Sequence, residues 1–326
     1  MKKNIAIVAG GDSSEIVISL KSAEGIHSFI DNDKYNLYIA IVKHDGWFVQ
    51  LPSGEHAPID KADFSFLEGG VKKLFDFAYI TIHGTPGEDG RLQGYFDMIG
   101  LPYSSCGMLV SALTFNKYVC NHYLKGFGVR IADSVLLRAD CKRVDPDTVI
   151  GRLGLPLFVK PNDGGSSFGI TKVKAAEELQ PAVDKAFAEG HEVVIESYIK
   201  GTEVTCGCYK VKGKEVLLPL TEVVTQNEFF DFDAKYNGQV QEITPARISS
   251  ELTAKVQQET SRIYDILGAK GLIRVDYIIP EDGNPCLLEI NTTPGMTATS
   301  FIPQQVRAAG LTMTDVMNDI IDNELN

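Results

Sequence analysis

The stretches LIRVDYII at residues 272–279 and CLLEIN at residues 286–291 decide the fold. Each reads as a β-strand, and the segment between them contains Asp282-Gly283, a favoured two-residue hairpin turn. The two stretches therefore predict an antiparallel hairpin close to the carboxyl end of the chain.

This hairpin predicts a metal site. With the turn at Asp282-Gly283, Asp276 faces Glu289 and Arg274 faces Asn291, and strand alternation puts all four side chains on one face. Like charges directly opposite each other destabilise a sheet, so two facing carboxylates need a cation. Hard oxygen ligands suit Mg²⁺, which proteins hold with one or two carboxylates while phosphates supply the rest. The alternative is a solvent-facing polar face that tolerates the repulsion.

A glycine-rich turn follows another apolar stretch, FVKPNDGGSSFG at residues 158–169. Lys160 ends the apolar part, and three glycines and two serines follow. Such a turn frees backbone N–H groups to bind phosphate oxygens, and the lysine adds positive charge. The Gly-Lys-Ser/Thr ending of a P-loop is missing, so this is a different kind of phosphate site. A mobile glycine hairpin is an equal alternative when the stretch is considered alone.

Three further motifs lie where predicted strands end. TIHGTPGEDG at residues 81–90 places His83 before a loop with three glycines and two carboxylates, either a substrate-binding loop or an ordinary turn. GGDSSE at residues 10–15 lacks the spacing of a dinucleotide fold, so a nicotinamide cofactor is unsupported; its Glu15 either binds an amine or faces solvent. ESYIKGTE at residues 196–203 is predicted as strand, glycine hinge and strand, with Glu196 and Glu203 placed to bind adenine and ribose or simply solvated.

The order of strands and helices predicts three units. In the first, strands at 4–9, 37–42 and 77–82 with a helix at 19–30 predict a doubly wound parallel sheet, whose ligands bind beyond the carboxyl ends of the strands. In the second, we expect a helix at 111–126 and strands at 156–160, 170–173 and 192–196. In the third, we expect strands at 203–211 and 215–221, a helix at 250–267 and the hairpin. Residues 225–246 are irregular, and so long a stretch inside a domain indicates a lid or an insert.

Composition narrows the class of protein. The 326 residues are 44% hydrophobic and 23% charged, enough for two or three packed domains of a globular protein. No apolar run approaches the ~20 residues of a membrane span, and the first apolar stretch reads as a strand rather than a signal peptide. The six cysteines form no Cys-x-x-Cys pair, which favours reduced buried thiols in a cytoplasmic protein. The net charge of −12 argues against a nucleic-acid surface but not against a nucleotide ligand.

In this order, the motifs resemble those of D-alanine–D-alanine ligases, within the ATP-grasp superfamily. The resemblance covers nearly the whole chain, from Gly10-Gly11 to NTTPGMT at residues 291–297, and the latter motif and HGTPGEDG are specific to this family. It implies an α/β (α+β overall) ATP-grasp fold whose N-terminal domain holds the doubly wound parallel sheet. It also implies domains at 1–105, 106–200 and 201–326, with a lid at 225–246.

The resemblance also implies site residues. Those that match ATP contacts are Lys117, Lys160, Glu196, Ser197, Ile199, Glu203 and Lys235. Those that match the ligands of two Mg²⁺ (or Mn²⁺) ions are Asp276, Glu289 and Asn291. Those that match substrate contacts are Glu15, His83 and Ser300, and those that match catalytic groups are Glu15, Ser166, Tyr236, Arg274 and Gly295.

The chemistry that the resemblance implies is the ATP-dependent joining of two D-alanine molecules through an acyl phosphate, for peptidoglycan precursor synthesis. Expected partners are ATP and D-alanine, with no nucleic acid and no membrane, in a cytoplasmic homodimer. The sequence departs from the family at Ile16-Val17, at Asn116 (often aspartate) and at Phe230 and Phe232 (often tyrosine).

Three alternatives remain open. One is a ligase that joins D-alanine to D-lactate or D-serine; Tyr236 argues against lactate, because lactate-specific relatives carry histidine there. Another is a different ATP-grasp carboxylate–amine ligase, which the two family-specific motifs disfavour. The third is a catalytically inactive nucleotide-binding regulator, which would need to have lost a metal ligand or a lysine, and all of these are present.

Overall fold

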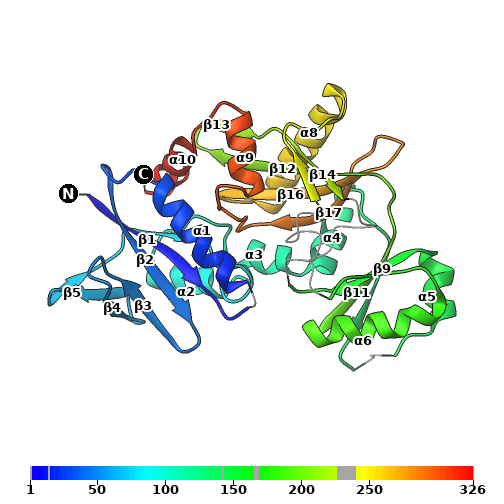
Figure 1. Ribbon diagram of the computed structural model, residues 1–326, viewed down its shortest axis with the longest axis horizontal. Coiled ribbons are helices and arrows are strands. Elements are labelled where there is room, and N and C mark those ends of the chain that lie inside the picture. Colours follow the sequence, from blue (N-terminus) through cyan, green and yellow to red (C-terminus); the bar gives the residue numbers. More distant parts are fainter. Residues whose placement is uncertain (1, 14, 141–142, 165–168, 226–239, 326) are drawn as a thin grey trace.

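The computed structural model describes residues 2–13, 15–140, 143–164, 169–225 and 240–325, which form three β-sheets with helices on their faces (Figure 1). The N-terminal sheet is blue in Figure 1, the central sheet is green, and the C-terminal sheet runs from yellow-green to orange. Among the described residues, none of the helices combines the length and the apolar character that a membrane span requires.

The N-terminal sheet has a parallel centre and a long antiparallel extension. Its strand order is β6-β5-β4-β3-β2-β1-β7, and β1 pairs in parallel with both β2 and β7, as the sequence predicts. The extension from β3 to β6 was not predicted, because these strands are only three to five residues long. The strands are β1 (Lys3–Gly10), β2 (Tyr35–Lys43), β3 (Gly46–Gln50), β4 (His56–Asp60), β5 (Ser65–Glu68), β6 (Val71–Lys73) and β7 (Phe77–Ile80).

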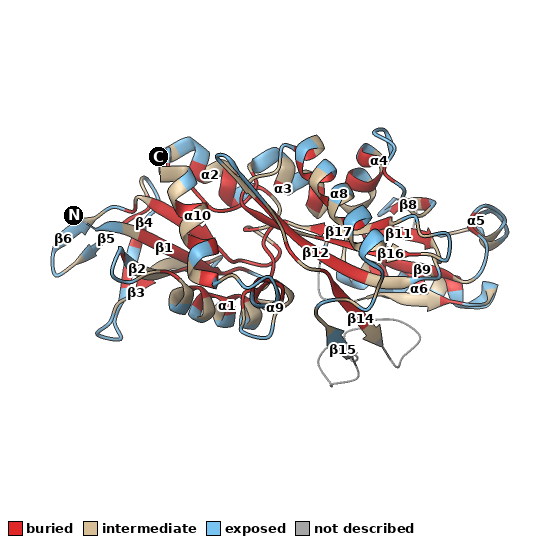
Figure 2. Ribbon diagram, turned by 90° about the horizontal axis from the view of Figure 1, so that it is seen from above, coloured by how far each residue is buried: buried red, intermediate tan, exposed pale blue. Residues whose placement is uncertain are grey.

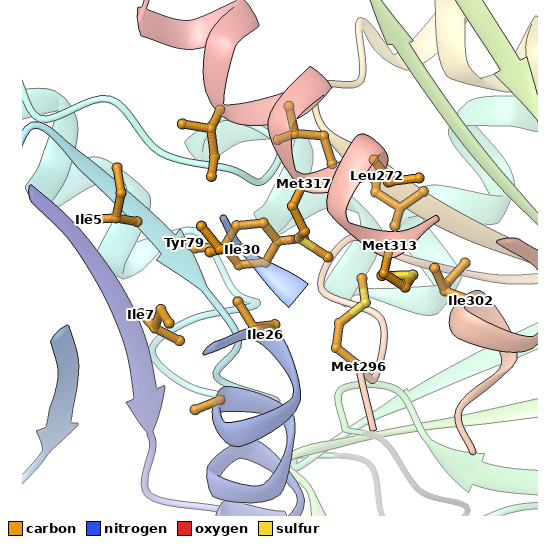
Figure 3. Packing of buried hydrophobic residues seen from close by; sticks show 14 of the residues in the cluster. Ile5, Ile7, Ile26, Ile30, Tyr79, Leu272, Met296, Ile302, Met313 and Met317 are labelled. Carbon is orange, nitrogen blue, oxygen red and sulfur yellow. The ribbon is translucent and has the colours of Figure 1, made fainter. Parts of the chain in front are cut away.

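Helices cover both faces of the parallel centre, as expected for a doubly wound sheet. Helix α1 (Ile16–Phe29) and the C-terminal helix α10 (Met313–Leu325) share one core with Ile5 and Ile7 of β1 (Figure 3). Helix α2 (Arg91–Ile99) packs through Phe96 against the alternate residues of β1. The last residues of the chain therefore complete the core around its first strand.

The helix predicted at 111–126 is two helices, α3 (Met108–Phe115) and α4 (Lys117–Lys125). Asn116 separates them with an extended backbone (φ −89°, ψ 97°), and its side-chain oxygen accepts a hydrogen bond from the Val119 N–H at 2.9 Å. Asparagine is a favoured N-cap, which explains the break. Cys120 and Leu124 of α4 belong to a core shared with the C-terminal sheet.

The central sheet has its own core. Its antiparallel strand order is β10-β9-β11-β8, and Leu157, Val159 and Ile195 pack against Val183 of α6. The strands are β8 (Ser134–Arg138), β9 (Leu157–Pro161), β10 (Thr171–Val173) and β11 (Glu192–Ser197). The helices are α5 (Pro146–Leu153), the 3₁₀ turn η1 (Ala176–Glu178) and α6 (Leu179–Glu189).

The C-terminal sheet follows the order β15-β14-β12-β16-β17, and β13 pairs with β12. Its inner strands β12 and β16 are buried along most of their length (Figure 2). The strand predicted at 215–221 is split around Pro219, which has no N–H to donate, so β13 and β14 pair with different parts of β12. The elements are β12 (Thr202–Val211), β13 (Lys214–Leu217), β14 (Thr221–Thr225), β15 (Val240–Ile243), α8 (Ser250–Leu267), β16 (Leu272–Ile279), β17 (Cys286–Asn291) and α9 (Phe301–Ala308).

The hairpin of β16 and β17 has the predicted pairs but not the predicted turn. Asp276 faces Glu289 and Arg274 faces Asn291, whereas the strands are joined by residues 280–285, not by two residues. Gly283, with a left-handed φ of 68°, donates its N–H to the Pro280 carbonyl oxygen at 2.9 Å. The longer connection shifts the pairing near the turn by one residue. A bulge between Asp276 and Tyr277 restores the predicted pairing at the other end.

Candidate active site

A cavity of about 1400 Å³ lies where the three sheets meet. Its volume exceeds the roughly 300–1,000 Å³ of common small-ligand pockets, so it has room for more than one ligand. All the described candidate residues line it: Glu15, His83, Lys117, Lys160, Glu196, Ser197, Ile199, Glu203, Arg274, Asp276, Glu289, Asn291, Gly295 and Ser300. The fold therefore brings these candidates together, while their individual roles stay predictions.

Three candidates lie outside the described residues: Ser166, Lys235 and Tyr236. The same holds for the lid positions Phe230 and Phe232, and for most of the predicted lid at 225–246.

The polar face of the C-terminal hairpin is held together by Asp276. The Arg274 guanidinium donates to both of its carboxylate oxygens, from Nε at 2.8 Å and from a terminal nitrogen at 2.7 Å. Asn291 Nδ2 donates to the same carboxylate at 3.3 Å. The Arg274 guanidinium also lies 5.2 Å from the centre of the Phe301 ring, at the start of α9. The arginine is therefore fixed in place beside the facing carboxylates.

The donor set here fits a divalent cation that shares its coordination with phosphates. Asp276, Glu289 and Asn291 supply two carboxylates and an amide oxygen, and among the described residues no three His, Cys, Asp or Glu side chains converge as a complete metal cage. Mg²⁺ takes one or two carboxylates and leaves the rest to substrate phosphates and water. Burial, reinforced by the charges of Asp276 and Glu289, raises the pKa of Glu203 to about 8. Bound cations would neutralise the charges of Asp276 and Glu289.

Two lysines border the cavity in different surroundings. Lys160 on β9 forms a buried ion pair with Glu196 on β11, with 2.6 Å between Nζ and Oε2 and side-chain exposures of 6% and 9%. Lys117, at the start of α4, donates from Nζ to the Gly164 carbonyl oxygen at 2.5 Å, and the same nitrogen lies 3.7 Å from Glu289 Oε2. The two ammonium groups thus reach the cavity from the central sheet and from the helix beside the metal candidates.

The expected nucleotide segment links the central and C-terminal sheets between β11 and β12. Ser197 and Ile199 line the cavity there, and the aromatic residues Phe158 and Tyr198 form a nearby pair with ring centres 5.9 Å apart. Gly201, predicted to be a hinge, also has a packing reason to be glycine, because a side-chain carbon there would lie only 2.3 Å from the Ile279 carbonyl oxygen.

The N-terminal sheet contributes the carboxyl ends of its parallel strands, as predicted. Glu15 precedes α1, and its N–H donates to Ser13 Oγ at 3.2 Å. The Ser13 hydroxyl in turn donates to the carbonyl oxygen of the buried His83 at 3.1 Å. These bonds join the loop after β1 to the loop after β7.

Glu88 was not chosen as a site residue from the sequence, although it lines the same cavity. Its carboxylate accepts a hydrogen bond from the Gly84 N–H at 2.9 Å. Burial raises its pKa to about 7, and the neighbouring charges of Glu15 and Glu289 add to the shift, while the Gly84 bond and Lys117 oppose it. The signal was present in the motif HGTPGEDG, which carries two carboxylates, but the sequence does not show which of them lines the cavity.

Ser300 precedes α9 on the remaining wall, in the segment that also carries Gly295. Ser300 Oγ accepts a hydrogen bond from the Thr297 N–H at 3.1 Å and lies 2.8 Å from Thr297 Oγ1. The beginning of a helix presents free N–H groups and a positive dipole end, which favours a carboxylate ligand. Thr297 also lines the cavity and was not selected from the sequence.

Comparison with known families matches almost the entire chain. Residues 4–106 match the family described as D-ala D-ala ligase N-terminus, and residues 123–322 match D-ala D-ala ligase C-terminus. The chain belongs to the D-alanine–D-alanine ligase family. Members of this family carry out ATP-dependent ligation of D-alanine to D-alanine for peptidoglycan synthesis.

Individual relatives of this ligase family span the same length. The D-alanine–D-alanine ligase of Parabacteroides distasonis is 79% identical, with 100% of this chain and 98% of the relative covered. That of Bacteroides fragilis strain YCH46 is 67% identical, with 99% and 100% covered. The predicted family and enzyme class are thereby confirmed.

Solved structures of ligases confirm the predicted ATP-grasp fold. The VanG D-Ala:D-Ser ligase from Enterococcus faecalis superposes with a TM-score of 0.89 at 29% identity, covering 99% of this chain and 100% of that one. The D-alanine–D-alanine ligase from Bacillus anthracis complexed with ATP has a TM-score of 0.78 at 30% identity, covering 99% and 97%.

Proposed function

We propose that this chain joins two D-alanine molecules in the cavity between its three sheets, with ATP as the source of energy. The observation that carries the proposal is the meeting of Lys117, Lys160 and Arg274 with the facing carboxylates Asp276 and Glu289 around one cavity. Cations and metal-binding carboxylates together suit phosphoryl transfer, which depends on positioning and charge neutralisation.

The reaction proceeds in two steps. A carboxylate is a poor acyl donor, so the γ-phosphoryl group of ATP is first transferred to a carboxylate oxygen of one D-alanine, and ADP leaves. The amine of the second D-alanine then attacks the acyl carbon, loses a proton, and the C–O bond to phosphate breaks. Inorganic phosphate leaves and an amide bond remains.

Each wall of the cavity has a part in these steps. Lys117 and Lys160 bind the ATP phosphates, and Glu196, Glu203 and the backbone near Ser197 and Ile199 bind adenine and ribose. Asp276, Glu289 and Asn291 would hold two Mg²⁺ or Mn²⁺ ions, which supply neutralisation of the phosphate charge. The carboxylates and amide on the hairpin support this assignment because they fit a cation that phosphates also coordinate.

The amino-acid contacts come from the other walls. Glu15 binds the ammonium group of the first D-alanine, beside His83. Ser300 and the start of α9 bind the carboxylate of the second. Arg274 and the Gly295 N–H stabilise the transferring phosphoryl group and the oxygen of the tetrahedral intermediate. We also assign the catalytic roles of Ser166 and Tyr236, and the phosphate contact of Lys235, from the family resemblance.

D-alanine is the proposed acceptor, and D-serine is the competing one because VanG, with 29% identity, is a D-Ala:D-Ser ligase. The 79% identical relative is a D-alanine–D-alanine ligase, which favours D-alanine. The test is a competition assay with ATP, Mg²⁺ and equal D-alanine, D-serine and D-lactate at pH 7.5, with products separated by mass. We expect D-alanyl-D-alanine in large excess. If most of the product is D-alanyl-D-serine, or the ester D-alanyl-D-lactate, the acceptor assignment is refuted. Release of ADP in the absence of D-alanine would refute the proposed reaction.

We further propose a cytoplasmic homodimer. The cysteines that the structure describes, at positions 106, 120, 206, 208 and 286, are free and buried, which suits a reducing compartment. Met98 on α2 and Met108 and Leu109 on α3 are large apolar side chains with 87%, 52% and 75% exposure, and such a patch suits a protein contact. A mass measurement in solution tests the dimer. Twice the chain mass, falling to the chain mass in Leu109→Glu, is expected; a monomeric parent would refute it.

A further inference from the structure

Asn162 forms four hydrogen bonds between three elements at the edge of the cavity. It is fully buried and directly follows β9, the strand that carries Lys160. Its N–H donates to the Glu192 carbonyl oxygen at 2.9 Å, and its own carbonyl oxygen accepts from the Lys117 N–H at 3.2 Å. Its side-chain Oδ1 accepts from the Tyr118 N–H at 2.8 Å, and Nδ2 donates to Glu192 Oε2 at 2.7 Å.

These bonds cap α4 from another part of the chain. The first N–H groups of a helix have no partner inside the helix. In α4, Asn162 satisfies those of Lys117 and Tyr118, and the local N-cap Asn116 satisfies that of Val119. Asn162 thus attaches the start of α4, with Lys117, to the end of β9, with Lys160. Asn162 is therefore one of the contacts that determine how the two lysines lie relative to each other.

Glu192 on β11 completes the arrangement. Its carboxylate accepts from Asn162 and, at 3.4 Å, from Asn116 Nδ2, while its other oxygen accepts from Arg138 Nε at 3.0 Å. Burial alone would raise the pKa of Glu192, but the bonds from Arg138, Asn162 and Asn116 outweigh it and lower the pKa. The carboxylate is therefore ionised at neutral pH, and both asparagines must present N–H donors to it.

We infer that Asn162 is a positioning residue for ATP, holding Lys117 and Lys160 at the separation that the phosphates require. The inference rests on the proposed phosphate role of these two lysines. Asn162 itself does not line the cavity and acts only through the elements that it joins.

The chemistry of the site requires an amide and not a carboxylate. Asn162→Asp keeps an oxygen for the Tyr118 N–H but turns the second oxygen toward the ionised Glu192, so the bond at 2.7 Å becomes a repulsion. The double substitution Asn162→Asp with Glu192→Gln restores a donor opposite an acceptor at the 2.7 Å contact, and gives up only the longer 3.4 Å bond from Asn116. This exchange reverses donor and acceptor in the hydrogen bond between residues 162 and 192, while the sizes of both side chains stay nearly the same.

The experiment measures KM for ATP, KM for D-alanine, kcat and Tm of the full chain. For Asn162→Asp we expect KM for ATP to rise about tenfold, equal to ~1.4 kcal/mol, with KM for D-alanine within twofold of the parent. The double variant should return KM for ATP to within about threefold of the parent. Asn162→Ala, which removes both side-chain bonds and adds no charge, should behave like Asn162→Asp and decides the question if the charged variant does not fold.

Matched variants separate this inference from the proposed function. Asn32→Asp adds the same charge at an exposed asparagine outside the cavity and should leave all four quantities unchanged. A KM for ATP that stays within twofold in Asn162→Asp, or a rise in both KM values together, overturns the positioning role. Recovery of Tm in the double variant without recovery of KM for ATP also overturns it. If Lys117→Met and Lys160→Met both leave KM for ATP unchanged, the phosphate role itself is refuted.

Discussion

Replacing Lys160 with methionine should weaken both the fold and ATP binding, because its ammonium group is buried against Glu196. The 2.6 Å pair is less than one-tenth exposed on either side. Removing one partner of a buried pair leaves an uncompensated charge, at a cost of about 3–5 kcal/mol. At roughly 2–4 °C for each kcal/mol, Tm should fall by roughly 6–20 °C. Loss of a charge-assisted bond to phosphate should in addition weaken ATP binding by about 10- to 150-fold.

The double variant Lys160→Met, Glu196→Met separates the two effects. Replacing a buried ion pair with apolar side chains of similar volume is often neutral or stabilising, so Tm should return close to the parent value. ATP affinity should stay low, because the phosphate contact is still missing. Lys3→Met serves as the control: it breaks an exposed pair with Asp76 and should change Tm by no more than about 4 °C.

The assay combines thermal unfolding with titration of ATP into each variant. Recovery of ATP affinity in the double variant would show that Lys160 acts through the fold and not on phosphate. An unchanged Tm in the single variant would refute the buried pair.

Three further outcomes follow from the same geometry. Glu289→Gln should lower turnover by ~10² or more with little change in Tm, since it removes charge from the metal face; near-parental activity at limiting Mg²⁺ would contradict the metal role. Asp276→Asn should lower turnover similarly but also lower Tm, because the buried Arg274 guanidinium loses its charged partner, and an unchanged Tm would count against that pairing. The bond from Arg247 holds the pKa of Glu222 below 4.5, so the pair stabilises the fold above that pH and loses this contribution as pH falls through the lowered pKa. Arg247→Met should therefore lower Tm at pH 7, with a deficit that shrinks below pH 4.5; a deficit independent of pH would refute this account.

The facing residue pairs of the C-terminal hairpin were predicted correctly, although the turn predicted to join the two strands was wrong. Alternation of side chains made Asp276 and Glu289 a pair once the strands were paired in the right register. The turn itself spans residues 280–285, and the bulge compensates for its extra length. A bulge depends on how both strands pack against their neighbours, so local sequence does not specify it.

The strands from β3 to β6 were not predicted, for a different physical reason. Each is short and lies in an antiparallel extension whose pairing partners are a few residues away, and their residues are buried by contacts such as Phe66 with Phe75. Such strands gain their stability from the sheet rather than from intrinsic propensity. The parallel centre was easier to predict because its strands are continuous apolar runs.

Site residues that stand in a recognisable motif could be predicted from the sequence. Contacts between residues that are distant in the sequence could not. Lys160 and Asp276 stand in recognisable stretches of sequence. The partner of Lys160, the raised pKa of Glu88 and the capping of α4 by Asn162 all depend on contacts between distant segments. These contacts decide which charges are free to act on a ligand.

The core in Figure 3 sets an order of events during synthesis. Ile5 and Ile7 of β1 share that core with Met296, Met313 and Met317, which are synthesised much later than β1. At about 5–20 residues per second, roughly 15 to 60 seconds separate the appearance of the two halves. Throughout that interval this apolar face of the N-terminal sheet is covered by α1 but not by α10. A growing chain in this state depends on being shielded from its neighbours until α10 has been synthesised.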